Sequence, residues 1–208
     1  MIDLYTWGTP NGRKVSIALE EMGLDYRVMP IDIGKGDQHA PDFLAISPNN
    51  KIPAIVDGET SVFESGAILL YLARKSGRFL PPEDSAEYRT VLQWLMWQMG
   101  GYGPMLGQAH HFLQFNPGVS EYAEKRFHAE AQRLSRVLDT RLGQSEFLAA
   151  ELSVADFAIW PWTSRFDYQR IDLNDYPNLA RWYRQLAERQ GFVRGYDVPQ
   201  GGTTIPLP

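Results

Sequence analysis

The pattern of hydrophobic residues changes at Pro81-Pro82, and this change limits the folds open to the chain more than any other feature. Before the two prolines, short strand signals alternate with helical ones, whereas the pattern after them is almost wholly helical. Consecutive prolines cannot continue a helix, so we expect residues 79–86 to form a linker. The sequence therefore predicts two domains, residues 1–78 and residues 87–208, each with its own layer architecture.

The first domain is predicted to be a small mixed sheet covered by helices. A strand signal at residues 2–5 leads into an amphipathic helix that should end at Gly23. A second strand is expected over residues 26–33, and a hairpin over residues 51–63 around an Asp-Gly turn. A helix over residues 67–75 then completes the order strand, helix, strand, hairpin, helix.

The second domain is predicted to be all-helical. Apolar residues between Ala123 and Leu142 step by three and four, which keeps one helix face apolar for six turns. Ser153-Val-Ala-Asp156 resembles a capping box at the start of the next helix. The glycine-rich segment 100–104 should kink or break a helix, and Gly191 should end the last helix.

Composition excludes several classes of chemistry. The chain has 208 residues and no cysteine, so it supplies no disulfide, no thiolate metal site and no cysteine nucleophile. Its adjacent histidines, His110 and His111, would point about 100° apart on a helix, and we predict no metal site. A formal net charge of −5 offers no electrostatic footprint for nucleic acid or an anionic membrane, so neither is an expected partner.

The N-terminus and the hydropathy pattern bear on location. The first residues have no basic segment and run directly into a strand pattern, so they do not resemble a signal peptide. The longest apolar run, residues 67–73, is too short to cross a bilayer. We therefore expect a cytoplasmic protein.

The turn from Gly8 to Lys14 is the first of three motifs with a possible ligand. It joins a strand to a helix whose first N–H groups and positive dipole end favour an anion. The alternative interpretation is a plain helix entry with Thr9 as the cap and Pro10 in the first turn.

The other two motifs follow in the same domain. If the peptide bond before Pro53 is cis, the backbone of Ile52 turns outward and can pair with an extended peptide; otherwise Pro53 is an ordinary proline at a sheet edge. Glu64 and Ser65 precede a helix and together suit the ammonium and carboxylate of an amino acid. The alternative is that Ser65 is only an N-cap.

In combination, these motifs resemble the cytosolic glutathione transferase family over essentially the whole chain. The family pattern has a proline before the third strand, Glu-Ser-Gly-Ala-Ile after the fourth, and Ser-x-x-Asp in the helical half, as here at Pro53, Glu64–Ile68 and Ser153–Asp156. Four segments are similar to the bacterial nu class, known for glutathione-dependent disulfide-bond reductases: Thr9–Gly12, Asp32–Gly36, Ile46–Pro53 and Gly103–Gln108. The resemblance implies an α/β thioredoxin-like N-terminal domain, an all-α C-terminal domain and a homodimer.

By position, the resemblance also implies which residues bind glutathione and which act in catalysis. Most candidates lie in the first domain, and one reaches the partner's site from the second. The glutathione-binding set is Asn11, Gln38, Lys51, Ile52, Pro53, Glu64, Ser65 and Arg126, and the catalytic pair facing the sulfur is Thr9 and Asn11.

In a chain without cysteine, the resemblance implies redox chemistry with thiols from glutathione itself. The helix N-terminus and a hydrogen bond from Thr9 or Asn11 would favour the thiolate, which attacks a disulfide substrate. One alternative is a transferase that conjugates glutathione to electrophilic small molecules in an apolar pocket near Tyr102, Met105 and Phe112. The other is a non-catalytic interaction module, which need not bind glutathione.

Overall fold

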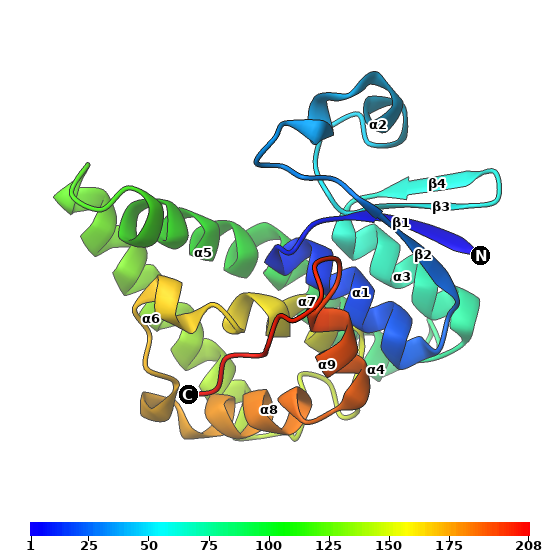
Figure 1. The fold of residues 1–208 in the computed structure, drawn as a ribbon. Coiled ribbons are helices and arrows are strands. Elements are labelled where there is room, and N and C mark those ends of the chain that lie inside the picture. The colour runs from blue at the N-terminus through cyan, green and yellow to red at the C-terminus, as the bar shows by residue number, and fades with distance from the viewer. The chain divides into compact units, whose positions relative to one another are not determined.

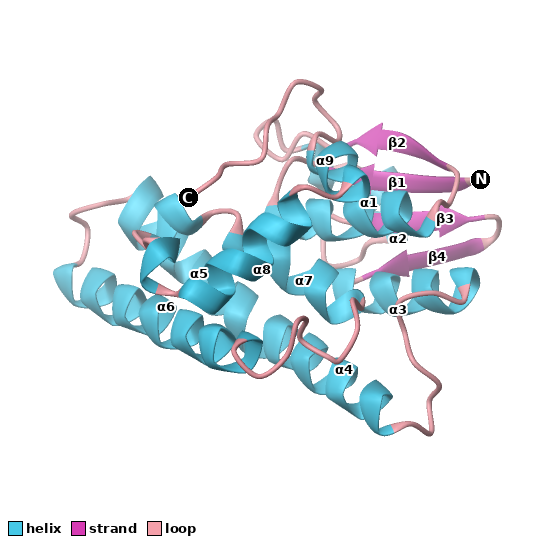
Figure 2. Ribbon diagram, turned by 90° about the horizontal axis from the view of Figure 1, so that it is seen from below, coloured by secondary structure: helices cyan, strands magenta, loops and turns pink.

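A computed structural model describes the whole chain, residues 1–208. The chain forms two compact units, one of Met1–Leu80 with Ala187–Ile205 and one of Pro81–Leu186 with Pro206–Pro208. All strands belong to the first unit, and the regular structure of residues 81–186 is entirely helical (Figures 1 and 2). The predicted fold class, a thioredoxin-like α/β part and an all-α part, is confirmed.

The sheet of the first unit has four strands in the order β2-β1-β3-β4. β1 (Ile2–Thr6) runs parallel to β2 (Tyr26–Pro30) and antiparallel to β3 (Ala54–Asp57), and β3 forms a hairpin with β4 (Thr60–Phe63). The mixed sheet is as predicted. β2 ends three residues earlier than expected, at Pro30, because its partner β1 ends at Thr6, which is in register with Pro30.

Helices cover both faces of this sheet. α1 (Pro10–Met22) and α3 (Ser65–Ser76) pack together on one face, and the short α2 (Pro41–Ile46) lies on the other (Figure 1). The apolar side chains between the sheet and the paired helices are fully buried, among them Leu4, Ile17, Ile55, Ile68 and Leu69. This layer holds the N-termini of α1 and α3 in fixed positions.

The second unit is built from long helices. α4 (Ala86–Trp97) and α5 (Gly103–His110) are joined by a π-helical turn over Gln98–Tyr102, which is the form taken by the predicted interruption. α6 (Glu121–Leu142) packs on α5, and α7 (Val154–Thr163) packs on α4. The predicted apolar stripe of α6 is fully buried only from Ala131 onward.

The predicted capping box at α7 is confirmed. The Ser153 and Asp156 side chains and backbones bond reciprocally, and Asp156 also accepts hydrogen bonds from the backbone N–H of Leu148 at 3.1 Å and the indole of Trp182 at 2.9 Å. Burial raises the pKa of Asp156 to about 6, although its four donors act in the opposite direction. Asp156 therefore connects the start of α7 by hydrogen bonds both to α8 (Pro177–Ala187) and to the loop that precedes α7.

The C-terminal segment differs from the expectation in two respects. Gly191 does not end a helix, because α8 stops at Ala187 and Gly191 lies inside α9 (Gln190–Tyr196). A Cβ at Gly191 would lie 2.5 Å from Oε1 of Glu21 on α1, a side chain that can move aside. In addition, residues 187–205 group with the first unit, whereas the expected second domain ran to residue 208.

Backbone contact with α1 explains this grouping. A Cβ on Gly195 would lie 2.5 Å from the backbone of Ile17, so only glycine lets α9 approach so closely. Ser16 Oγ donates to the Gly195 carbonyl at 2.6 Å, and Arg13 Nε donates to the Tyr196 carbonyl at 3.0 Å. The Arg13 guanidinium also stacks 3.6 Å above the Tyr196 ring. No helix of the structure combines the length and apolar character that crossing a membrane requires.

Candidate functional site

The turn into α1 places Thr9 and Asn11 at a helix N-terminus. Thr9 is the N-cap, and its Oγ1 accepts a hydrogen bond from Gly12 N at 3.2 Å. A Cβ on Gly12 would lie 2.2 Å from the Trp7 carbonyl oxygen, so this tight turn requires glycine. The cap interpretation of Thr9 is therefore correct, and it is compatible with a role toward a ligand because a hydroxyl that accepts one bond still donates another.

Ile52 and Pro53 stand at the entrance to β3. The peptide bond between them is cis, so the trans alternative is wrong. Strand pairing of β3 begins at Ala54, which leaves the backbone of Ile52 outside the sheet ladders. Lys51 is exposed, and its carbonyl accepts a hydrogen bond from Ser47 Oγ at 2.9 Å. The short segment 51–53 thus offers an extended ligand a backbone edge next to an exposed cation.

Glu64 and Ser65 open α3. Glu64 occupies the N-cap position with φ 71°, a left-handed backbone conformation that is uncommon outside glycine, and its side chain makes no capping bond. Ser65 is the first helical residue and is buried, so the interpretation of Ser65 as a plain N-cap is wrong. Unusual backbone of this kind is most frequent at ligand sites, which favours the binding interpretation.

Lys14 is a buried cation that the sequence analysis did not single out. Its side chain runs from α1 to the start of α3, where Nζ donates to Ser65 Oγ at 3.3 Å, and it is only 1% exposed. Burial lowers the pKa of Lys14 to about 7, against the negative charge of Glu64, which raises it. The only available signal was its spacing, four residues before Ala18 on the apolar face of the helix.

Gln38 lies in a single 3-10 turn, Asp37–His39. Its Oε1 is buried and accepts no hydrogen bond from the protein, while its Nε2 lies 3.2 Å from His39 Nε2. His39 Nδ1 in turn lies 3.2 Å from Asn50 Nδ2, so this histidine links Gln38 to the loop before Lys51. A buried acceptor without a donor is costly unless a ligand or water supplies one. The geometry therefore favours a ligand donor at Gln38.

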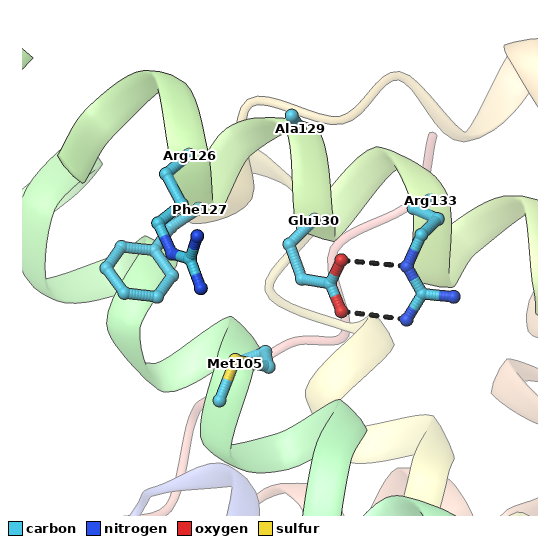
Figure 3. A pocket seen from close by; sticks show the side chains of 6 residues that line it. All are labelled: Met105, Arg126, Phe127, Ala129, Glu130 and Arg133. Atoms are coloured by element: carbon cyan, nitrogen blue, oxygen red, sulfur yellow. Dashed lines mark hydrogen bonds and ion pairs between the residues drawn. The ribbon is translucent and has the colours of Figure 1, made fainter. Parts of the chain in front are cut away.

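Arg126 belongs to the second unit, where it lines a pocket of about 350 Å³ between α5 and α6 (Figure 3). The guanidinium of Arg126 points toward Met105 across this space. Arg133 and Glu130 form a two-bond ion pair on the same wall, with both bonds at 2.8 Å. Arg133, followed by Arg126, lowers the pKa of Glu130. Arg126 is thus an exposed cation beside an otherwise neutralised wall.

The apolar pocket expected near Tyr102, Met105 and Phe112 is only partly present. Tyr102 is fully buried, with its hydroxyl 2.9 Å from Thr163 Oγ1, and therefore belongs to the core. Phe112 stacks on Phe127 with ring centroids 5.6 Å apart. Of the three, only Met105 lines the pocket. The structure contains no cluster of three or more histidine, cysteine or acidic side chains suited to a metal ion.

Comparison with known proteins assigns the family. Residues 1–74 match the model of the glutathione S-transferase N-terminal domain, and residues 120–185 match that of its C-terminal domain. The disulfide-bond oxidoreductase YfcG of Escherichia coli is 53% identical over 197 residues, which cover 91% of each chain. The protein is a member of the glutathione S-transferase family. A second Escherichia coli member, the disulfide-bond oxidoreductase YghU, is 42% identical over 93% of this chain and 73% of its own.

Solved structures of other glutathione S-transferase family members share the fold. A glutathione transferase from Pseudomonas putida, with one glutathione disulfide bound per subunit, superposes with a TM-score of 0.90 at 40% identity, covering 95% of this chain and 91% of its own. A family member from Pseudomonas fluorescens, with two glutathione molecules bound, also has a TM-score of 0.90 at 40% identity, covering 95% and 93%. Both relatives bind glutathione or its disulfide.

Proposed function

We propose that this protein is a glutathione-dependent disulfide-bond oxidoreductase in which the reactive thiol belongs to bound glutathione. The observation that carries the proposal is the turn from Thr9 to Gly12, which presents a hydroxyl, an amide and a helix N-terminus in a chain that has no cysteine. YfcG and YghU, which are similar over most of this chain, are both disulfide-bond oxidoreductases.

Binding of glutathione is assigned to residues of the first unit. The N-terminus of α3 with Ser65 suits the γ-glutamyl carboxylate, and Glu64 suits its ammonium. The backbone of Ile52, turned by the bond to Pro53, suits the cysteinyl residue. Gln38 and Lys51 serve the glycyl end of glutathione: Lys51 suits the carboxylate, and Gln38 Oε1 suits the glycyl N–H as its acceptor.

The reaction is a pair of thiol–disulfide exchanges. An ordinary thiol with a pKa near 8.5 is only about 3% ionised at pH 7, and hydrogen bonds from Thr9 and Asn11 at the start of α1 would raise that fraction. The glutathione thiolate attacks one sulfur of the substrate disulfide, and the other sulfur leaves as a thiolate and takes up a proton. A second glutathione attacks the mixed disulfide, releasing glutathione disulfide and the second substrate thiol.

The subunit arrangement and the location are part of the same proposal. We infer a homodimer in which Arg126 of one subunit extends toward the glutathione site of the other, because this exposed cation lines a pocket whose carboxylate, Glu130, already pairs with Arg133. A reaction that consumes reduced glutathione also fits the cytoplasm, where thiols are kept reduced. Light scattering should give the mass of a dimer.

The test is the rate of glutathione-dependent reduction of 2-hydroxyethyl disulfide, coupled to glutathione reductase and NADPH. The wild-type rate should exceed the uncatalysed exchange. Replacing Thr9 and Asn11 together by alanine should lower turnover roughly 10- to 100-fold, because a hydrogen bond to a charged group contributes about 1.5–3 kcal/mol. Thr140→Ala, an exposed threonine of α6, is the matched control and should leave the rate unchanged. A wild-type rate equal to background would refute the proposal.

Two alternatives have distinct readouts in solution. Conjugation needs an apolar pocket, and the buried Tyr102 does not line one, so the rate with an electrophile such as 1-chloro-2,4-dinitrobenzene should be low. A non-catalytic module need not bind glutathione at all. Calorimetric titration with glutathione therefore separates the module from both enzymes.

A further inference from the structure

Lys14 is a buried ionisable group to which the proposed exchange reaction assigns no role. Its position on α1, beneath the start of α3, brings Nζ to 3.3 Å from Ser65 Oγ, and the residue is 1% exposed. Lysine is rarely buried to this degree, because removing an ammonium from water is costly. An alanine or leucine would fill the interface between two packed helices at lower cost, so the charge itself calls for a role.

The direction of the hydrogen bond indicates what that role is. An ammonium group has donors only, so Nζ occupies an acceptor position on Ser65 Oγ. The hydroxyl hydrogen of Ser65 is then directed away from Lys14, as a donor. Ser65 is the first residue of α3, where the free N–H groups also attract a carboxylate.

We propose that Lys14 is a positioning residue of the γ-glutamyl site, which holds the Ser65 hydroxyl in the orientation that donates to the glutathione carboxylate. This inference rests on the glutathione site proposed above. Lys14 does not touch the ligand in this arrangement. It acts through Ser65, and its positive charge lies behind the carboxylate subsite in a part of the protein from which water is excluded.

The protonation state of Lys14 makes this arrangement dependent on pH. Burial lowers its pKa to about 7, and the negative charge of Glu64 acts in the opposite direction. The other ionisable side chains of α1 and of the helices packed on it are Arg13, Glu20, Glu21, Tyr71, Arg74, Lys75, Arg194 and Tyr196. A neutral amine, unlike an ammonium, also accepts hydrogen bonds, so above this pKa the Ser65 hydroxyl can turn toward Nζ and away from the carboxylate.

Two consequences follow from linkage. Affinity for the γ-glutamyl carboxylate should be highest below pH 7, where Lys14 is charged, and should decrease as the pH rises through about 7. Reciprocally, a bound carboxylate favours the charged form, so binding above pH 7 should take up a proton. A merely structural Lys14 would affect stability, and its replacement would leave the pH dependence and the proton uptake unchanged.

The experiment is calorimetric titration of the full-length protein with S-methylglutathione between pH 6.0 and pH 8.5. This ligand keeps the γ-glutamyl group but has no free thiol, so ionisation of sulfur does not contribute. Titrations in two buffers with different ionisation enthalpies give the number of protons taken up. The wild type should bind roughly tenfold more weakly at pH 8.5 than at pH 6.0, with net proton uptake at pH 8.

Variants separate position from charge. Lys14→Met should bind weakly at all pH values, close to the wild type at pH 8.5, whereas Lys14→Arg keeps its charge and should show a flat pH profile. Lys75→Met makes the same change at the exposed end of α3 and should keep the wild-type profile. If Lys14→Met fails to fold, as judged by circular dichroism, the difference in pH profile and proton uptake between Lys14→Arg and the wild type decides.

The outcomes distinguish this inference from the proposed function. Wild-type binding that is independent of pH and takes up no proton would overturn the role of Lys14 and leave the glutathione site intact. A Lys14→Met variant that retains the wild-type pH profile would do the same. Failure of the wild type to bind S-methylglutathione and glutathione at any pH would overturn the proposed function, and the role of Lys14 with it.

Discussion

Replacing Gly195 by alanine should loosen the C-terminal helix α9 from α1. A Cβ at this position would lie 2.5 Å from both the Cα and the N of Ile17, and 2.8 Å from the Ser16 carbonyl carbon. These are backbone atoms inside a helix, so they cannot rotate away as the end of a side chain can. Helix α9 must therefore move back by about 1 Å to restore ordinary contact.

The magnitude follows from three contributions. Overpacking of this kind costs about 1–3 kcal/mol. The retreat also stretches the 2.6 Å hydrogen bond from Ser16 Oγ to the Gly195 carbonyl, at a cost of about 1 kcal/mol. The higher helix propensity of alanine offsets up to about 1 kcal/mol of this destabilisation. The net loss in the free energy of unfolding should be about 2 kcal/mol, a decrease of about 4–8 °C in Tm for a chain of this size.

Thermal and urea unfolding followed by circular dichroism would measure this loss. Gly107→Ala is the matched control, because Gly107 also lies inside a helix but its Cβ would meet Trp162 at an ordinary 3.5 Å. The control should be as stable as the wild type or slightly more stable. A Gly195→Ala variant with the stability of the control would refute the reasoning that close backbone approach holds residues 187–205 on the first unit.

Two further predictions concern buried ionisable groups of the second unit. Asp156→Ala should lower the free energy of unfolding by about 3–5 kcal/mol in urea titrations, because it leaves buried N–H donors without their acceptor. The control Asp167→Ala removes an exposed carboxylate and should change the free energy of unfolding by less than about 0.5 kcal/mol. Equal effects of the two substitutions would contradict the capping role of Asp156. The same carboxyl and His110 should give the unfolding free energy opposite dependences on pH. Burial raises the pKa of Asp156 to about 6, so its stabilising contribution is complete below pH 4 and is lost as the pH rises through 6. Burial, followed by the charge of Arg165, lowers the pKa of His110 to about 4, so its contribution is complete above pH 6.5 and is lost as the pH falls toward 4. Each contribution is about 3 kcal/mol. Between pH 6.5 and pH 4 the wild type should therefore lose about 3 kcal/mol of unfolding free energy that His110→Gln does not lose. A pH dependence of the variant equal to that of the wild type would contradict this assignment.

Much of the fold could be predicted from local patterns. The alternation before Pro81 and the periodicity of α6 depend on residues within one or two turns or strands of each other, and the structure shows the expected mixed sheet and helices. The capping box of Ser153 and Asp156 is equally local. The candidate residues Thr9, Ile52 and Ser65 stood out because each lies at a junction between elements, where backbone groups are free to bind a ligand.

Other features depend on which elements meet. Local spacing predicted a helix end at Gly191, but in the structure Gly191 lies inside α9, and Gly195 of the same helix is the point of close approach to the α1 backbone. The link from Gln38 through His39 to Asn50 likewise joins residues whose side chains carry no joint signal in the sequence. Tyr102 was expected beside a pocket, and its burial follows from the packing of α7, which supplies Thr163.

The sequence by itself determined the family, the strand–helix order and the absence of a protein thiol, because these follow from composition and from patterns with a short range along the chain. Only the tertiary structure decided that the lysine at position 14 is a buried neighbour of Ser65, and that α9 returns to the first unit. Burial and pKa depend on what surrounds a side chain, and those surroundings come from segments far apart in sequence: α3 lies about fifty residues beyond Lys14, and α9 nearly two hundred beyond the start of α1.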